Sequence, residues 1–233
     1  SFINGDFELG DTTGWTLGTG NRAPYYNNTY SPIMTPGLFL PGGTAYNSAL
    51  NHSAIVGTSY VDPNVGAVIG TTVYAGNYSL RVEDTTSGGY ASVVTQTVNN
   101  YTDSNIFFAW KAVLLGAHSD YDAATMLITL TDVTTGEELI RREYNAASGG
   151  GGVDPRFSIY NNNYYTPQWQ IEQLAIDASR QGHDFTLSVL AADCEPTAHW
   201  GYVYLDGFGA VIPPSGNTPV PGALALLGIG ALG

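Results

Sequence analysis

Carboxylates stand among aromatic residues near both ends of the chain, in a combination that points to cation binding. Near the start, "NGDFELG" places Asp6 and Glu8 on either side of Phe7. Near the end, "GYVYLDGFG" places Asp206 in a run of aromatic and aliphatic residues. An aspartate in such a core-forming strand must be neutralised, and beside Asp6 or Glu8 it would need a cation between the carboxylates. Oxygen ligands of this kind suit calcium, so the sequence predicts calcium as a structural cofactor.

Tyrosine-rich loops form the second set of candidate residues. "YYNNTYSP" and "YNNNYYTP" resemble each other, although biased composition would also produce such a pair. Tyrosine rings can stack on sugar rings, and asparagine amides can bond to sugar hydroxyls. The same residues would suit a protein–protein interface, and the sequence leaves both interpretations open. The candidate carbohydrate-binding residues are Tyr25, Tyr26, Tyr30, Tyr160, Tyr164 and Tyr165.

Support for catalysis is weak. "HSDYD" places His118 near two aspartates, which could form a metal or acid–base site, but a polar loop explains it better. His199 is predicted to be a turn or core histidine. No nucleophile elbow, HExxH motif or phosphate-binding loop is present, so we expect a protein that is not an enzyme. Cys194 is the only cysteine, which excludes an intrachain disulfide and a zinc cluster of thiolates. It is predicted to be a small buried side chain, with an intermolecular disulfide as the alternative.

The composition limits the class of protein. The 233 residues suffice for one large β domain, and the 29 glycines and 16 tyrosines favour strands joined by turns. Seven basic against twenty acidic residues give a formal net charge of −13, which would repel nucleic acid and anionic membranes. The low lysine content is typical of exported proteins. No leader-like segment is visible from Ser1 onward, which fits either a cytosolic protein or a mature chain whose leader was removed, and the composition favours the second.

Short runs of alternating apolar residues predict strands that must position these side chains. The clearest are Val68–Ala75, Tyr78–Val82, Ala91–Val98, Ile106–Leu115, Thr125–Val133, Trp169–Ile176, Phe185–Ala191 and Tyr202–Val211. Gly136 is predicted at a turn position with positive φ, and Ile171–Arg180 could hold one helical turn at most. The fold class is therefore all-β, an antiparallel β-sandwich or jelly roll followed by an apolar C-terminal tail.

The motifs follow, in order, the layout of a known group of domains. "NGDFELG…GW", "YSLRVED", "VTQTV", "TDVTTGEEL", "WQIEQLAID" and "GYVYLDGFG" resemble galactose-binding-like jelly rolls, a group that includes the family 4-type carbohydrate-binding modules. The resemblance spans residues 1–212. It implies a structural calcium ion where the first and last strands meet, with Glu8 and Asp206 as ligands and Asp6 as a third candidate.

The last residues resemble an export signal. "PVPGALALLGIGALG" is similar to the PEP-CTERM sorting signal of Gram-negative bacteria, although Gly222 replaces the glutamate of the motif and no arginine cluster follows. The resemblance implies an exported protein associated with exopolysaccharide and biofilm matrix. Residues 213–221 would be a proline-rich linker, and residues 222–233 a tail that as a helix would reach only about 18 Å, too short for a membrane span. Its predicted assembly residues are Leu224, Leu226, Leu227, Ile229 and Leu232.

Two functions follow. The first is a secreted structural protein of the cell surface or biofilm matrix, which polymerises into an extracellular filament when each tail binds the next subunit. The alternative is a calcium-stabilised carbohydrate-binding module that binds exopolysaccharide as a monomer. The expected partners are therefore another copy of the chain or exopolysaccharide, with no nucleic acid and no membrane span. Both functions predict a location outside a Gram-negative cell.

Overall fold

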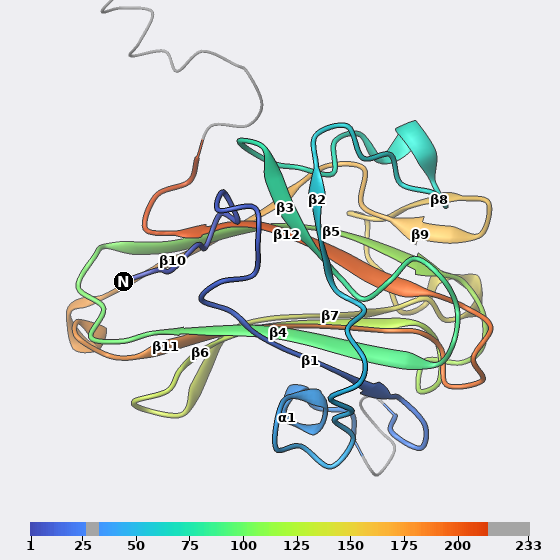
Figure 1. The fold of residues 1–233 in the computed structure, drawn as a ribbon, viewed down its shortest axis with the longest axis horizontal. Helices are drawn as coiled ribbons and strands as arrows, with labels where there is room; N and C mark the ends of the chain where they lie inside the picture. Colours follow the sequence, from blue (N-terminus) through green and yellow to red (C-terminus); the bar gives the residue numbers. More distant parts are fainter. Residues whose placement is uncertain (27–32, 214–233) are drawn as a thin grey trace, which may run out of the picture.

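Stretches of alternating apolar and polar residues form two antiparallel sheets that stack face to face (Figure 1). The structure, a computed structural model, describes residues 1–26 and 33–213. One sheet has five strands in the order β1-β4-β11-β6-β7. The other has seven, with β2-β3-β12-β5-β9-β8 in a row and β10 paired with β5. The prediction of an all-β antiparallel sandwich is confirmed.

The elements have the following bounds. The strands of the five-stranded sheet are β1 (Thr16–Asn21), β4 (Tyr90–Val98), β6 (Thr125–Asp132), β7 (Glu137–Asn145) and β11 (Phe185–Ala192). Those of the seven-stranded sheet are β2 (Ala54–Gly57), β3 (Tyr78–Val82), β5 (Asn105–Leu115), β8 (Ser158–Tyr160), β9 (Asn163–Tyr165), β10 (Gln170–Ala175) and β12 (Gly201–Gly209). The helical segments are α1 (Pro36–Phe39) and the 3₁₀ turns η1 (Gly66–Ile69), η2 (Ser148–Gly150) and η3 (Ala178–Arg180). In the part of the chain that the structure describes, no helix is both long and apolar enough to cross a membrane.

One predicted strand is wrong. Residues 68–75 contain the end of η1 and a loop rather than a strand. The apolar side chains of Ile69 and Val73 are buried, which explains the alternating pattern. The backbone between these two residues nevertheless pairs with no strand. The ammonium group of Lys111 from β5 holds this loop by donating to the carbonyl oxygens of Ile69 and Thr71. The predicted helical turn before Arg180 is confirmed as η3, and Gly136 has a φ of +76°.

The main core lies between the two sheets, and β12 shows how the alternation works. Val203 and Leu205 face this core, whereas Tyr202 and Tyr204 point to the other side of the sheet, because successive side chains of a strand alternate between its faces. Both tyrosine hydroxyls donate to the buried carboxylate of Asp62, at 2.7–2.9 Å. The outer face of the seven-stranded sheet is thereby closed by a polar cluster under the loop that follows β2.

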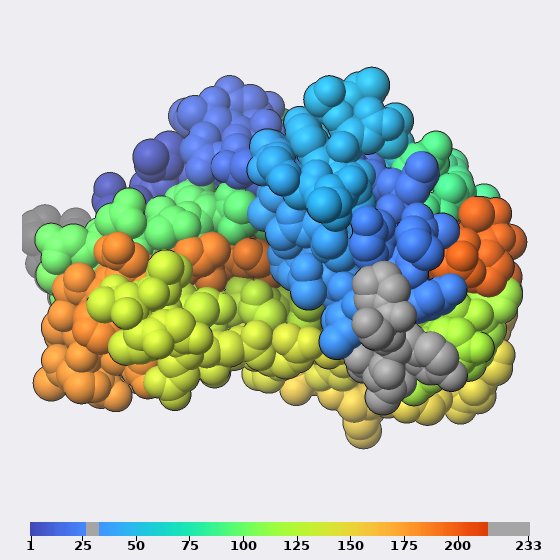
Figure 2. All heavy atoms as spheres, turned by 90° about the horizontal axis from the view of Figure 1, so that it is seen from below, coloured from blue at the N-terminus to red at the C-terminus, as the bar shows by residue number. Residues whose placement is uncertain are grey.

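A smaller core lies on the outer face of the five-stranded sheet, where α1 and its flanking residues cover β4 and β11. Figure 2 looks onto this side, with the α1 segment standing out in blue. The segment can approach the edge strand because Gly18 and Gly20 of β1 have no side chain. A Cβ atom at Gly18 would lie 1.9 Å from the carbonyl oxygen of Phe39, and one at Gly20 would lie 1.9 Å from that of Ala45.

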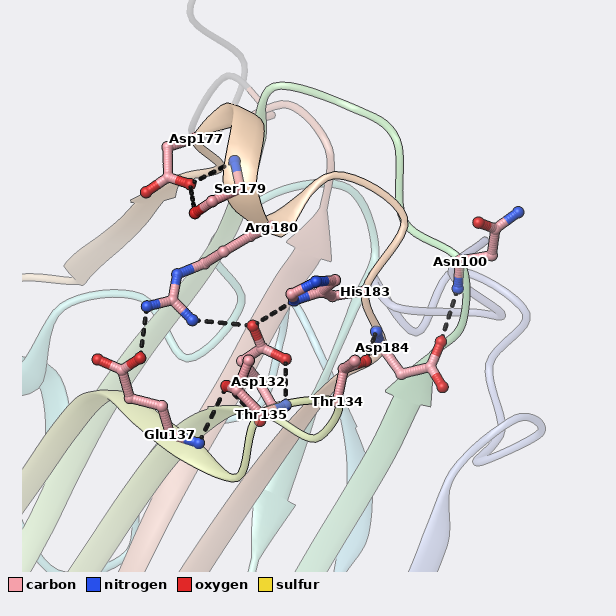
Figure 3. Close-up of polar contacts among 10 residues, drawn as sticks. All are labelled: Asn100, Asp132, Thr134, Thr135, Glu137, Asp177, Ser179, Arg180, His183 and Asp184. Atoms are coloured by element: carbon pink, nitrogen blue, oxygen red, sulfur yellow. Dashed lines mark hydrogen bonds and ion pairs between the residues drawn. The ribbon is translucent and has the colours of Figure 1, made fainter.

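Buried charge joins three elements at one end of the sandwich, where β6 turns into β7 (Figure 3). Asp132, at the end of β6, is fully buried. Its Oδ2 accepts from Arg180 Nη1 at 2.8 Å and contacts His183 Nδ1 at 2.7 Å, and its Oδ1 accepts from the Thr135 amide at 3.2 Å. Arg180 also donates to Glu137 at 2.5 Å. This network ties the β6–β7 turn to the segment that carries η3.

The C-terminal residues of the predicted domain division are only partly described. The linker prediction, residues 213–221, falls outside the described residues except for Pro213, and the whole predicted tail, residues 222–233, lies outside them. Tyr30, one of the predicted carbohydrate-binding residues, also lies outside the described residues. Predictions about these residues therefore stay predictions.

Candidate functional site

Two adjacent hollows run along the edge strand β1. The larger, of about 450 Å³, is bounded by Asn21 and Tyr25 on one side and by the residues around Tyr46 on the other. The smaller, of about 200 Å³, lies over β1 and reaches Asn51. Because the two hollows share Tyr46 and Ser48, we refer to them together as the tyrosine trough. Its lining residues are Leu17, Gly18, Thr19, Asn21, Ala23, Pro24, Tyr25, Thr44, Ala45, Tyr46, Asn47, Ser48, Leu50 and Asn51.

Backbone contacts fix the walls of the tyrosine trough. Tyr46 forms a bridge to Gly20 of β1, and the Asn47 amide donates to the carbonyl oxygen of Thr19 at 2.9 Å. On the opposite wall, the Tyr25 ring packs edge-on against the buried Phe39, with ring centroids 5.9 Å apart. Its hydroxyl lies 3.3 Å from Thr44 Oγ1. Tyr25 and Tyr46 are both half-buried, and both line the larger hollow.

The chemistry of the lining is uncharged. Its polar side chains are hydroxyls and primary amides, its aromatic side chains are tyrosines, and none of the lining residues is acidic or basic. The whole chain, by contrast, has a formal net charge of −13. Hydroxyls, amides and rings together suit a neutral ligand that carries many hydroxyl groups and has apolar ring faces.

The predicted tyrosines do not come together in one surface. Tyr25 lines the trough, and Tyr26 lies near it in sequence with its ring edge-on to Tyr121 at 5.9 Å. Tyr30 lies outside the described residues, and the remaining three, Tyr160, Tyr164 and Tyr165, belong to β8 and β9 of the opposite sheet. There Tyr164 is half-buried and packs against the main core, whereas Tyr165 is buried among the outer residues of β5 and β12 and offers no free ring face. Tyr160 is exposed, at 42%.

Tyr46 and Asn47 line the tyrosine trough together with Ser48, although they are not among the predicted carbohydrate-binding residues. The signal was available, because "TAYNS" has the same tyrosine–asparagine composition as the two loops that were singled out. Those loops stood out only through their resemblance to each other. In the folded chain, the relevant partner of Tyr25 is Tyr46, which shares its hollow.

The predicted calcium ligands lie on either side of one loop, residues 74–78. Asp206, on β12, is fully buried and accepts from the amides of Tyr74 and Ala75 at 3.0 and 3.2 Å, and from its neighbour Gly207 at 2.7 Å. Glu8 accepts from the amides of Asn77 and Tyr78 at 3.0–3.1 Å. The first and last segments of the domain therefore meet here, as the resemblance implies.

The electrostatics of this carboxylate pair suit a cation. Burial raises the pKa of Asp206 to about 8, even though backbone amides lower it, and the negative charge of Glu8 raises it further. A divalent ion between the two carboxylates would remove this cost, so Glu8 and Asp206 fit calcium by charge and by ligand type. Asp6 is exposed, and its carboxylate accepts from the Glu8 amide at 3.2 Å. The ion itself stays a prediction.

The chain is similar to several solved structures, but the comparisons do not assign it to a protein family. No protein-family model matches the chain, and neither does any curated protein. Among solved structures, TmCBM61 in complex with β-1,4-galactotriose is 10% identical, with a TM-score of 0.41 over 88% of this chain and 93% of that one. CBM27-1 of Caldicellulosiruptor saccharolyticus in complex with mannohexaose is 11% identical, with a TM-score of 0.43 over 91% and 97%. CBM28, a module specific for non-crystalline cellulose, is 12% identical, with a TM-score of 0.39 over 89% and 93%.

These three similar structures are carbohydrate-binding modules with a β-sandwich fold. At identities of 10–12% they assign no ligand to this chain, and its fold is established by its own two sheets. The resemblance of the last residues to the PEP-CTERM signal stays a prediction, because those residues lie outside the described chain.

Proposed function

We propose that this domain is a non-catalytic module that binds a neutral polysaccharide in the tyrosine trough. The observation that carries the proposal is the uncharged lining: two half-buried tyrosine rings, amides and hydroxyls on a strongly acidic protein. Tyr25 and Tyr46 offer ring faces to pyranose rings, while Asn21 and Asn47 offer amides to sugar hydroxyls. This is the second of the two functions that the sequence predicts.

The charge of the chain narrows the ligand class. A net charge of −13 disfavours acidic polysaccharides through long-range repulsion, so the preferred ligand is an uncharged glycan chain. The larger hollow, at about 450 Å³, has the size of an ordinary small-molecule site, and the smaller one extends it along β1. Two hollows in a row suit a ligand made of repeating units rather than a single sugar.

Replacing Tyr46 with alanine is expected to weaken binding to a neutral polysaccharide at least about tenfold, because the variant removes the ring that both hollows share. Affinity electrophoresis in gels that contain a panel of neutral and acidic polysaccharides measures this directly. Tyr46→Phe keeps the ring and should retain most of the affinity. The melting temperature of each variant shows whether the fold is intact.

The matched control is Tyr160→Ala, which removes an exposed tyrosine from β8 of the other sheet. We expect it to bind as the wild type does. Equal retardation of the wild type, Tyr46→Ala and Tyr160→Ala would show that the trough is not the binding site. Retardation of none of them by any neutral polysaccharide would contradict the proposed function itself.

Self-association through the tail is a second proposal, which rests on the sequence alone. Residues 222–233 carry only apolar side chains and glycine, and burying their four leucines and one isoleucine would contribute about 10 kcal/mol before the cost of ordering the chain. We expect a chain truncated after residue 217 to stay folded, soluble and monomeric while the full chain forms oligomers or filaments. Electron microscopy and light scattering measure the difference. The same assemblies from the truncated chain would show that the tail is not the connector.

A further inference from the structure

Three metal-ligating side chains from distant parts of the sequence converge at one end of the sandwich. His118 lies in the loop between β5 and β6, whereas Cys194 and His199 lie in the turn between β11 and β12. One potential ligand atom from each residue lies within 4.8 Å of the other two. We propose that Cys194, His118 and His199 form a zinc site that fastens these two loops together.

Two of the three distances between the ligand atoms are close to those around a tetrahedral ion, and the third, between His118 and Cys194, is within 4.8 Å. His118 Nε2 lies 3.1 Å from His199 Nδ1, and Cys194 Sγ lies 3.3 Å from the same nitrogen. With zinc bonds of about 2.0 Å to nitrogen and about 2.3 Å to sulfur, tetrahedral geometry places two nitrogens about 3.3 Å apart and nitrogen and sulfur about 3.5 Å apart. Each observed distance is within about 0.3 Å of the value for zinc.

Hydrogen bonds alone do not account for the close approach of these three side chains. His199 Nδ1 is close to both His118 Nε2 and Cys194 Sγ, yet a ring nitrogen has either one proton to donate or one lone pair to share. A single ion between the three atoms would let each ligand use its own lone pair.

The sulfur is held in place by the backbone of its own turn. Cys194 is fully buried, and the backbone amide of His199 donates to its Sγ at 3.2 Å. The amide directed at the sulfur would also support a negative charge there, and metal binding would release the thiol proton.

Zinc is the ion that best fits these ligands. One thiolate and two imidazoles form a mixed sulfur–nitrogen set, which zinc binds in tetrahedral sites, and three protein ligands leave a fourth position for water. The two loops already contact each other, because the Glu195 amide donates to the carbonyl oxygen of Asp122 at 2.9 Å. An ion would therefore strengthen an existing junction.

The test uses the purified full chain, stripped of metal by dialysis against a chelator and then supplied with zinc chloride alone. We expect one zinc per chain by mass spectrometry of the metal content, and protection of Cys194 from a thiol reagent added under mildly denaturing conditions. Cobalt in place of zinc should produce a sulfur-to-cobalt charge-transfer band. His118→Ala and Cys194→Ala should each lower the zinc affinity at least about 100-fold.

The control is His52→Gln, because His52 belongs to the other cluster of potential ligands, with Glu83 and Asp84. This variant should keep its zinc. Equal zinc content in the wild type and His118→Ala, loss of zinc in His52→Gln instead, or a cobalt complex without the charge-transfer band would each overturn the proposal. Circular dichroism of every variant separates the loss of a ligand from the loss of the fold.

Discussion

Calcium is expected to raise the melting temperature of this protein by about 5–10 °C when it is present at 100 times its dissociation constant. Such an excess of a ligand stabilises the folded state by about 2.7 kcal/mol, and in a domain of this size each kcal/mol shifts the melting temperature by about 2–4 °C. The physical cause is the pair formed by Glu8 and Asp206, two carboxylates that contact the same loop from two other segments and whose charges an ion would neutralise. Differential scanning calorimetry before and after chelation measures the shift.

A distinctive pH dependence should accompany this effect. Without an ion, the folded pKa of Asp206 is about 8, above the ordinary value of 3.8, so the folded state holds its proton more tightly than the unfolded state does. The stability that this proton contributes is fully present below the ordinary pKa and is lost as the pH rises toward 8. With calcium bound, this loss should disappear. The stabilisation by calcium should therefore be larger near pH 8 than near pH 5.

Two variants and two ions make the calcium experiment specific. Asp206→Asn removes the charge at nearly constant shape and should abolish the response to calcium, whereas Asp11→Asn changes an exposed carboxylate of the same N-terminal segment and should leave it intact. Since chelators also remove zinc, calcium and zinc are added back separately, and only calcium should restore the effect that depends on Asp206. If neither chelation nor added calcium changes the melting temperature, the carboxylate pair holds no ion.

The strands that the sequence predicted well are those buried on alternating sides. β3 has the predicted bounds, Tyr78–Val82, because Leu80 and Val82 both enter the main core. The strand β1 could not be predicted in this way, because its outward positions include glycines at 18 and 20. Their role becomes visible only when the α1 segment lies against them. A search for alternating apolar side chains therefore misses β1, because glycine has no side chain that could contribute to the pattern.

The candidate sites divide in a similar way. Glu8 and Asp206 could be proposed together because carboxylates next to core residues are conspicuous in a sequence, and a resemblance paired the two ends. The group of His118, Cys194 and His199 could not, since its two histidines are 81 residues apart and no local spacing joins them. The tyrosine trough could not be predicted for a similar reason. The path of the chain around α1 brings Tyr25 and Tyr46 to one hollow, and this path has no periodic pattern in the sequence.

The largest effect of a single substitution that we expect away from the core is that of Asp132→Ala. It should lower the free energy of unfolding by about 3 kcal/mol, because removing one partner of a buried ion pair leaves the others without compensation. Asp132 is fully buried and contacts both Arg180 and His183 (Figure 3). Urea denaturation measures the change. Glu137→Ala is the matched control, since Glu137 bonds to the same arginine but its side chain is 58% exposed, and it should cost less than about 1 kcal/mol.

Acidification tests the same network without changing its shape. Burial alone would raise the pKa of Asp132, but hydrogen bonds from His183, Arg180 and Thr135 lower it from 3.8 to about 2. The folded state thus binds this proton more weakly than the unfolded state, so the stability it contributes is fully present above the ordinary pKa and is lost as the pH falls through about 2. The shift corresponds to about 2 kcal/mol. Asp132→Ala should therefore lose less stability than the wild type between pH 4 and pH 2, and parallel loss in the two proteins would show that the charge of Asp132 does not hold this end of the sandwich together.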